Sequence, residues 1–202
     1  MDFKTLVAGP GGLASVPADA LLVVLSGETL AAGLPQPLAD AAQAALNAGD
    51  LALKAGQSFF AWRVPGVKAE RVVFAACGRA DAKAFRKAVA SSLAALKGGG
   101  ARHVAVALQG TDWTPAHAEA LVGAADEAVY VYRHTKPSAP ESSKLSRVSL
   151  VCAKPQQAEL DRALRQGRAI AAGVALAREY ANRPGNHCTP SDLAQQARKL
   201  GK

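Results

Sequence analysis

The residue types that most often bind metals or carry out acid–base chemistry are thinly spread along this sequence. Its histidines stand far apart, at His103, His117, His134 and His187. No HExxH motif or similar pair is present. The acidic residues are also dispersed, whereas a two-metal hydrolase needs carboxylates converging on metals about 4 Å apart. We therefore predict no catalytic and no metal-binding residue in this chain, and we interpret each histidine as a surface or capping residue.

Two small residues follow apolar runs that are typical of buried strands, where α/β enzymes sometimes place a nucleophile. They are Cys77, which precedes Gly78, and Ser26, which precedes Gly27. A nucleophile needs an adjacent base, and the sequence assigns no histidine or acid to either position. We interpret Cys77 as a buried structural thiol and attach no chemistry to Ser26.

The segment from Gly9 to Ala14 formally matches the dinucleotide-binding pattern G-x-G-x-x-A. That pattern works only when a helix begins there and directs its N-terminus at a pyrophosphate. Pro17 stands where the helix should run, and the next apolar run follows almost at once. We interpret the segment as a loop between two strands.

The chain carries 24 Lys and Arg against 16 Asp and Glu, a formal net charge of +8. Such an excess permits attraction to nucleic acid. The cations are scattered, however, and no dense run has aromatic residues between them, which favours solubility and contacts between subunits. The best candidates for nucleic-acid contact lie on one predicted helix and just before it: Arg79, Lys83, Arg86 and Lys87.

The sequence also indicates a compartment. No apolar run approaches the roughly 20 residues that a membrane span needs. The start, from Met1 to Lys4, lacks the basic flank and cleavage site of a secretory signal. Its three cysteines, Cys77, Cys152 and Cys188, lack metal-ligand spacing. We expect reduced thiols in a cytoplasmic protein that does not contact membranes.

Short β-like runs alternate with helical patterns, which predicts an α/β layered domain. The predicted strands are 20–25, 57–64, 71–76, 103–108 and 147–152. One helix is predicted over 37–48. A second starts near Asp81 and carries an apolar stripe made of Phe85, Val89, Leu93 and Leu96. A third starts at Thr114-Pro115 and runs to about Tyr132, before a surface loop over 133–144.

A single long helix is predicted from about Pro155 to Asn182. Its inner stripe comprises Leu160, Leu164, Gly167, Ala171 and Val174. At 1.5 Å per residue it spans roughly 40 Å, more than is needed to cover a small sheet. A helix that extends past its own domain usually connects to something else.

The last residues combine a chain break with a new helix start. Pro184 disfavours helical conformation at Arg183, and Gly185 allows a sharp change of direction. Thr189 and Asp192 then have the spacing of a capping box, with proline between them at the first helical position. This pattern predicts a domain junction, although a helical hairpin that folds back on the long helix is the alternative.

The stretch LAREYANRPGNHCTPSDLAQQARKL, from Leu176 to Leu200, resembles the junction of the cytosolic leucyl aminopeptidase family. In that family a long helix ends in Asn-x-Pro-Gly-Asn-x-x-Thr-Pro and leads into the metallopeptidase domain. The matching positions here are Asn182, Pro184, Gly185, Asn186, Thr189 and Pro190. The segments VVFAACGRADAKAFRKAVASSLAAL and EALVGAADEAVYVYRHTKP are similar to earlier parts of the same family.

The resemblance implies a three-layer, macro-domain-like mixed sheet flanked by helices, with a long C-terminal linker helix. It divides the chain into a macro-like domain (1–153), an interdomain helix and Pro-Gly corner (154–185), and the opening segment of an absent catalytic domain (186–202). Family members are typically homohexamers that release N-terminal residues from peptides with two divalent cations, Mn or Zn. Their ligands lie in later motifs, so none of these cofactors is expected in this chain, which is predicted to be inactive alone.

Three functions therefore stay open. The first is an assembly and access domain of a metal-dependent exopeptidase, with its own catalytic domain and other subunits as partners. The second is a nucleic-acid-binding module, since some family members also act on DNA. The third is a standalone nucleotide-binding domain, which only the macro-like fold suggests.

Overall fold

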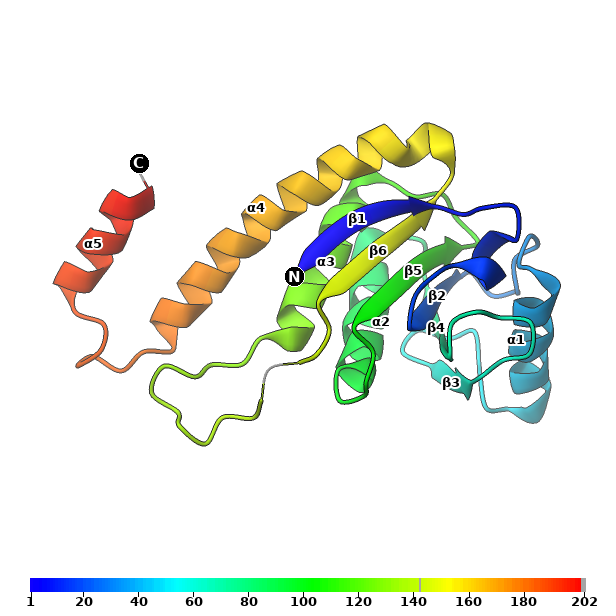
Figure 1. Ribbon diagram of the computed structural model, residues 1–202, viewed down its shortest axis with the longest axis horizontal. Helices are drawn as coiled ribbons and strands as arrows, with labels where there is room; N and C mark the ends of the chain where they lie inside the picture. Colours follow the sequence, from blue (N-terminus) through cyan, green and yellow to red (C-terminus); the bar gives the residue numbers. More distant parts are fainter. Residues whose placement is uncertain (142, 201–202) are drawn as a thin grey trace.

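The computed structural model describes residues 1–141 and 143–200, and these form a mixed sheet with helices on both faces (Figure 1). The strands are β1 (Asp2–Val7), β2 (Ala20–Ser26), β3 (Ser58–Trp62), β4 (Arg71–Gly78), β5 (His103–Gln109) and β6 (Arg147–Cys152). The sheet has six strands in the order β1-β6-β5-β2-β4-β3. Every neighbouring pair is parallel except β3 and β4, which are antiparallel.

In the described part of the chain, five α-helices and two short 3₁₀ turns connect and follow these strands. The helices are α1 (Gln36–Ala48), α2 (Ala82–Leu96), α3 (Pro115–Val129), α4 (Gln157–Ala181) and α5 (Pro190–Leu200). The 3₁₀ turns are η1 (Gly12–Ser15) and η2 (Lys154–Gln156). The predicted α/β fold class is confirmed.

Alternating side chains of the buried strands supply two separate cores, one on each face of the sheet. In β2, Leu22 and Val24 pack with α2, α3 and α4, whereas Leu21 and Val23 pack on the opposite face with α1. The whole of β2 is buried. This is why it reads in the sequence as a continuous apolar run rather than an alternating one. The result is three layers, helices–sheet–helix.

Helix α2 forms as its sequence predicts. The carboxylate of Asp81 accepts a hydrogen bond from the backbone N–H of Ala84 at 2.8 Å and so caps the first turn. The stripe made of Phe85, Val89, Leu93 and Leu96 is buried against the sheet.

Several predicted boundaries differ from the observed ones, most clearly those of α3 and β3. Helix α3 ends at Val129 rather than near Tyr132, because Tyr130 adopts an extended backbone conformation (φ −62°, ψ 130°). Strand β3 covers 58–62, whereas 57–64 was predicted. Both differences lie at element ends, which are the least sharply defined parts of helices and strands.

Helix α4 packs over only part of its length. Leu160, Leu164 and Gly167 are buried, while Val174, predicted to lie on the same stripe, is 47% exposed. A Cβ atom at Gly167 would lie 3.0 Å from the Cα of Glu119, so this glycine lets α4 approach α3 closely. Past that contact α4 runs beyond the sheet, and α5 lies further out (Figure 1).

Among the described helices, none is long and apolar enough to cross a membrane.

Candidate interdomain junction

Tyr130 holds the outer end of α4 against the α/β body. Its hydroxyl accepts a hydrogen bond from the Asn182 side-chain amide at 3.1 Å and donates a longer one to Glu179 at 3.5 Å. The guanidinium of Arg178 lies over its ring, 4.8 Å from the ring centroid. The extended conformation that ends α3 at Tyr130 thus belongs to a residue that fixes the end of another helix.

Arg183 fixes the corner that follows α4. Its guanidinium pairs with Glu179 at 3.4 Å and stacks over the ring of Tyr180 at 4.3 Å. The side chain is only 18% exposed. The chain then turns at Pro184, whose carbonyl oxygen accepts the N–H of His187 at 2.8 Å. The corner is therefore held by side-chain contacts as well as by the proline.

A capping box starts α5. The carboxylate of Asp192 accepts hydrogen bonds from the Thr189 backbone N–H at 2.9 Å and from the Thr189 hydroxyl at 2.7 Å. The backbone N–H of Asp192 in turn donates to the Thr189 hydroxyl oxygen at 3.4 Å. These bonds lower the pKa of Asp192 below its ordinary value. The sequence signature of Thr189, Pro190 and Asp192 therefore forms the helix start that it predicts.

Helix α5 buries none of its residues. Leu193 is 50% exposed and Leu200 is 73% exposed, with Ala197 between them on the same helical face. The remaining positions of α5 are mostly polar or charged. Instead of forming a packed hairpin with α4, α5 leaves an apolar stripe uncovered. An amphipathic helix of this kind gains most of its stability from a surface that covers the stripe.

One contact at the junction has no signal in the sequence. The rings of His134 and His187 lie edge to face, with centroids 5.5 Å apart and planes at 88°. They come from the loop after α3 and from the segment after α4. Side-chain contacts between two irregular segments leave no periodic pattern, so local sequence reasoning missed the pair.

The other two histidines are structural. The Nδ1 atom of His117 completes the N-terminal cap of α3 with Thr114. The Nε2 atom of His103 lies 2.8 Å from the Ser149 hydroxyl. Burial is the main cause that lowers the pKa of each imidazole. His117 caps a helix as predicted, although it is buried and not at the surface.

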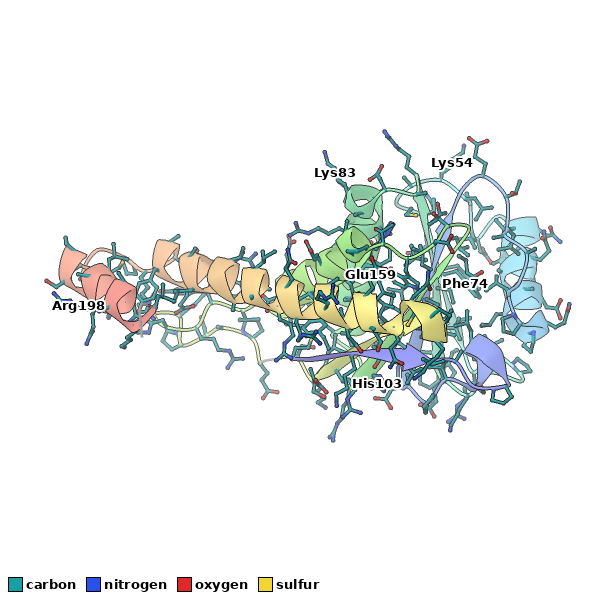
Figure 2. All side chains as sticks on the ribbon, turned by 90° about the horizontal axis from the view of Figure 1, so that it is seen from above. Lys54, Phe74, Lys83, His103, Glu159 and Arg198 are labelled. Atoms are coloured by element: carbon teal, nitrogen blue, oxygen red, sulfur yellow. The ribbon has the colours of Figure 1, made fainter. Side chains whose placement is uncertain are left out.

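The candidate nucleic-acid residues are partly neutralised by acids. Arg79 pairs with Asp81 at 3.1 Å, and Arg86 pairs with Glu127 at 3.0 Å. Lys83 and Lys87 are exposed on α2, and Figure 2 shows Lys83 extending outward from that helix. These four residues do not form an uninterrupted positive surface.

A hollow of about 600 Å³ lies beside α2, lined by Cys77, Arg79, Asp81, Lys83 and Lys87 among others. The Asp81 carboxylate already occupies the positive end of α2, so a phosphate placed there would meet a negative charge. This arrangement gives no support to the nucleotide-binding alternative.

Cys77 is a buried thiol, and its Sγ donates to the carbonyl oxygen of Leu25 or of Arg79, at 3.3 and 3.2 Å. Burial raises its pKa, which disfavours the reactive thiolate. The structural interpretation of Cys77 fits this environment. Within residues 1–141 and 143–200, no group of three or more His, Cys, Asp or Glu side chains is placed to hold a metal ion.

The class of protein follows from this geometry: an α/β domain of three layers, extended by an anchored helix and a second helix with an uncovered apolar stripe. Residues 21–138 match the model of the cytosol aminopeptidase family, N-terminal domain. The chain belongs to this family, as the resemblance at its C-terminal end predicted.

Curated relatives extend the similarity over the whole chain. A probable cytosol aminopeptidase of Methylibium petroleiphilum is 50% identical over 100% of this chain and 42% of its own length. One of Polaromonas sp. is 40% identical over 100% of this chain and 39% of its own length. This chain therefore spans about two fifths of the length of these relatives.

The fold also matches a solved structure. A mutant of tomato leucine aminopeptidase superposes with a TM-score of 0.74 at 23% identity, covering 99% of this chain and 42% of that one. This similarity supports the fold.

Proposed function

We propose that this chain is the non-catalytic N-terminal domain of a leucyl aminopeptidase, a metal-dependent exopeptidase that releases N-terminal amino acids from peptides. The domain would serve assembly of the enzyme and control access to its active site. The observation that carries the proposal is the similarity to a probable cytosol aminopeptidase that is 50% identical to this chain and more than twice as long. In this proposal the two divalent cations, Mn or Zn, belong to the catalytic domain, and the enzyme is a cytoplasmic homohexamer.

The junction supplies the physical support. Helix α4 has 25 residues and spans about 38 Å at the usual helical rise. One side of its first half is buried against the sheet and α3, and its outer end is held by Tyr130 and Arg183. Such a helix can hold two domains at a fixed separation. The apolar stripe on α5, made of Leu193, Ala197 and Leu200, would be covered by the catalytic domain.

The domain boundaries are part of the proposal: a macro-like domain over 1–153, the interdomain helix and corner over 154–185, and the opening segment of the catalytic domain over 186–202. The junction residues are Asn182, Pro184, Gly185, Asn186, Thr189 and Pro190. The last two residues of that segment, 201–202, lie outside the described residues.

The proposal predicts that the pure 202-residue chain does not hydrolyse a leucyl anilide in the presence of manganese. The described side chains offer no cluster able to bind a metal ion and activate a water molecule. Release of the anilide chromophore is measured, with the full-length Methylibium relative assayed in parallel as the positive control. The proposal would be contradicted if the short chain hydrolysed the anilide in a manganese-dependent way and if this activity co-purified with the folded chain.

A further inference from the structure

Strand β3 forms one edge of the sheet, and its outer backbone groups can be identified from its bonds to β4. The carbonyl oxygen of Gln57 accepts the N–H of Ala76, and the N–H of Arg63 donates to the carbonyl oxygen of Glu70. In an antiparallel pair the residues that bond the neighbour alternate along the strand. Phe59 and Ala61 therefore also form backbone hydrogen bonds with β4. The alternate residues Ser58, Phe60 and Trp62 direct their backbone N–H and C=O groups outward, away from β4.

The same strand exposes two large aromatic side chains. Phe60 is 49% exposed and Trp62 is 51% exposed, while Phe59 and Ala61 pack into the core on the other face. Natural edge strands usually carry a lysine, a proline, a bulge or a covering segment that prevents pairing with another chain. The sequence from Ala55 to Trp62 contains no charged residue and no proline. The edge is thus an open pairing surface.

We propose that β3 pairs with β3 of a second copy of this chain, antiparallel and about a two-fold axis at Phe60. In that register Phe60 lies opposite Phe60 of the second copy, and Ser58 lies opposite Trp62. Each outward N–H and C=O of these three residues then meets an outward group of the second copy. The edge is complementary to itself, which is the requirement for a two-fold interface.

Charge favours a second copy over an acidic or basic partner. The strand is uncharged, and its nearest cations, Arg63 and Arg71, lie beside Trp62 at one end. The antiparallel register places this end against the uncharged Gly56–Gln57 end of the second copy. The cations of the two copies therefore stay apart. The Arg71 guanidinium, 4.6 Å from the Trp62 ring centroid, also holds the indole in place.

A strand of five residues buries little area, so we expect a weak dimer whose population rises with protein concentration. Sedimentation equilibrium of the 202-residue chain should show masses between one and two chains. The substitution Phe60→Lys places two lysines opposite each other at the axis and should raise the dimer dissociation constant at least about tenfold. The matched control is Ile170→Lys on α4, where the isoleucine is 52% exposed, and this variant should dimerise like the parent.

The register has its own test. In a Cys188→Ser background, Phe60→Cys should form a disulfide-linked dimer under mild oxidation, because paired Cα atoms lie about 5.5 Å apart. Trp62→Cys should not, since the two Cys side chains would be separated by about four residues, roughly 14 Å. Circular dichroism of each variant checks that it is folded.

The proposal is overturned if sedimentation equilibrium shows that the chain remains monomeric at every concentration tested. It is equally overturned if Ile170→Lys, and not Phe60→Lys, abolishes the dimer. Equal cross-linking of Phe60→Cys and Trp62→Cys would also reject the two-fold register, because random collision would then account for both.

Discussion

His117 is a buried histidine whose two ring nitrogens both have partners. The Nδ1 atom accepts a hydrogen bond from the Thr114 backbone N–H at 3.3 Å, so Nε2 carries the proton and donates to the carbonyl oxygen of Ala80 at 3.1 Å. The ring also packs edge to face with Phe85 and Trp113. A second proton on Nδ1 would remove the acceptor for Thr114 and place a charge in the core. Burial accordingly lowers the pKa of His117.

This environment predicts how stability depends on pH. The folded protein binds the proton less tightly than the unfolded chain, whose histidine titrates near pH 6.5. The free energy of unfolding is therefore highest above that pH and falls as the pH decreases toward the lower, folded-state pKa. The substitution His117→Gln keeps a residue type that can complete a capping box but removes the titrating imidazole. We expect a loss of about 1–2 kcal/mol at pH 8 from packing, and a shallower decline between pH 6.5 and 5, measured by urea unfolding.

His103 supplies the comparison, because burial lowers its pKa as well. The His117→Gln variant should therefore retain the part of the decline that His103 causes. If the variant and the parent lose stability in parallel below pH 6.5, His117 does not contribute to the pH dependence.

At the scale of elements, the contacts of Tyr130 explain why α4 stays helical after it leaves the sheet. Its outer half has exposed apolar residues, including Val174, and no sheet beneath it. An unsupported helix end frays, because its last carbonyl groups lack helical partners. The bonds from Tyr130 to Glu179 and Asn182 supply a tertiary restraint at that end.

The substitution Tyr130→Phe should loosen this end without unfolding the body. It removes both hydrogen bonds but keeps the ring beneath Arg178. A loss of about 1 kcal/mol in local stability should speed amide hydrogen exchange about fivefold over the last turn of α4. Tyr132→Phe is the matched control, since its hydroxyl lies 2.9 Å from the Thr135 hydroxyl in the following loop and, among the described residues, makes no hydrogen bond to α4. Unchanged exchange in Tyr130→Phe would show that the helix end is held by other contacts.

Elements that bury a full face could be predicted from the sequence. Features that depend on contacts between distant segments could not. Strands such as β2 and β4 are easy to predict, because both of their faces are covered and their sequences are continuous apolar runs. Val174 fits the apolar period of α4 but is 47% exposed and lines a hollow beside α3, and no local pattern records where the packing of a helix ends. The turn at Pro184 and the helix cap formed by Thr189 and Asp192 were predictable because proline, glycine and capping residues act locally. The contacts of Tyr130 were not, because they join segments far apart in the chain.

The whole molecule consists of a packed body and a projecting arm. Seen from above, the buried Phe74 of the sheet and Arg198 on α5 lie far apart, with α4 spanning the distance between them (Figure 2). The large fully buried side chains, among them Phe74, Phe85 and Leu160, all belong to the body and to the inner half of α4. Stability should therefore be distributed unevenly between body and arm.

Two truncations test this distribution. Removing 186–202 deletes α5, which buries no residue, and should change the unfolding midpoint by less than about 2 °C. Removing 154–202 also deletes Leu160, Ala163 and Leu164, which are buried against the sheet. Each buried leucine contributes about 2–5 kcal/mol, so this loss is comparable with the whole stability of a domain, about 5–15 kcal/mol. We expect the longer truncation to lose cooperative thermal unfolding, measured by circular dichroism. A cooperative transition that persists without α4 would show that residues 1–153 fold without the packing of that helix, against this prediction. A strong effect of removing α5 alone would show that α5 packs on the body in solution.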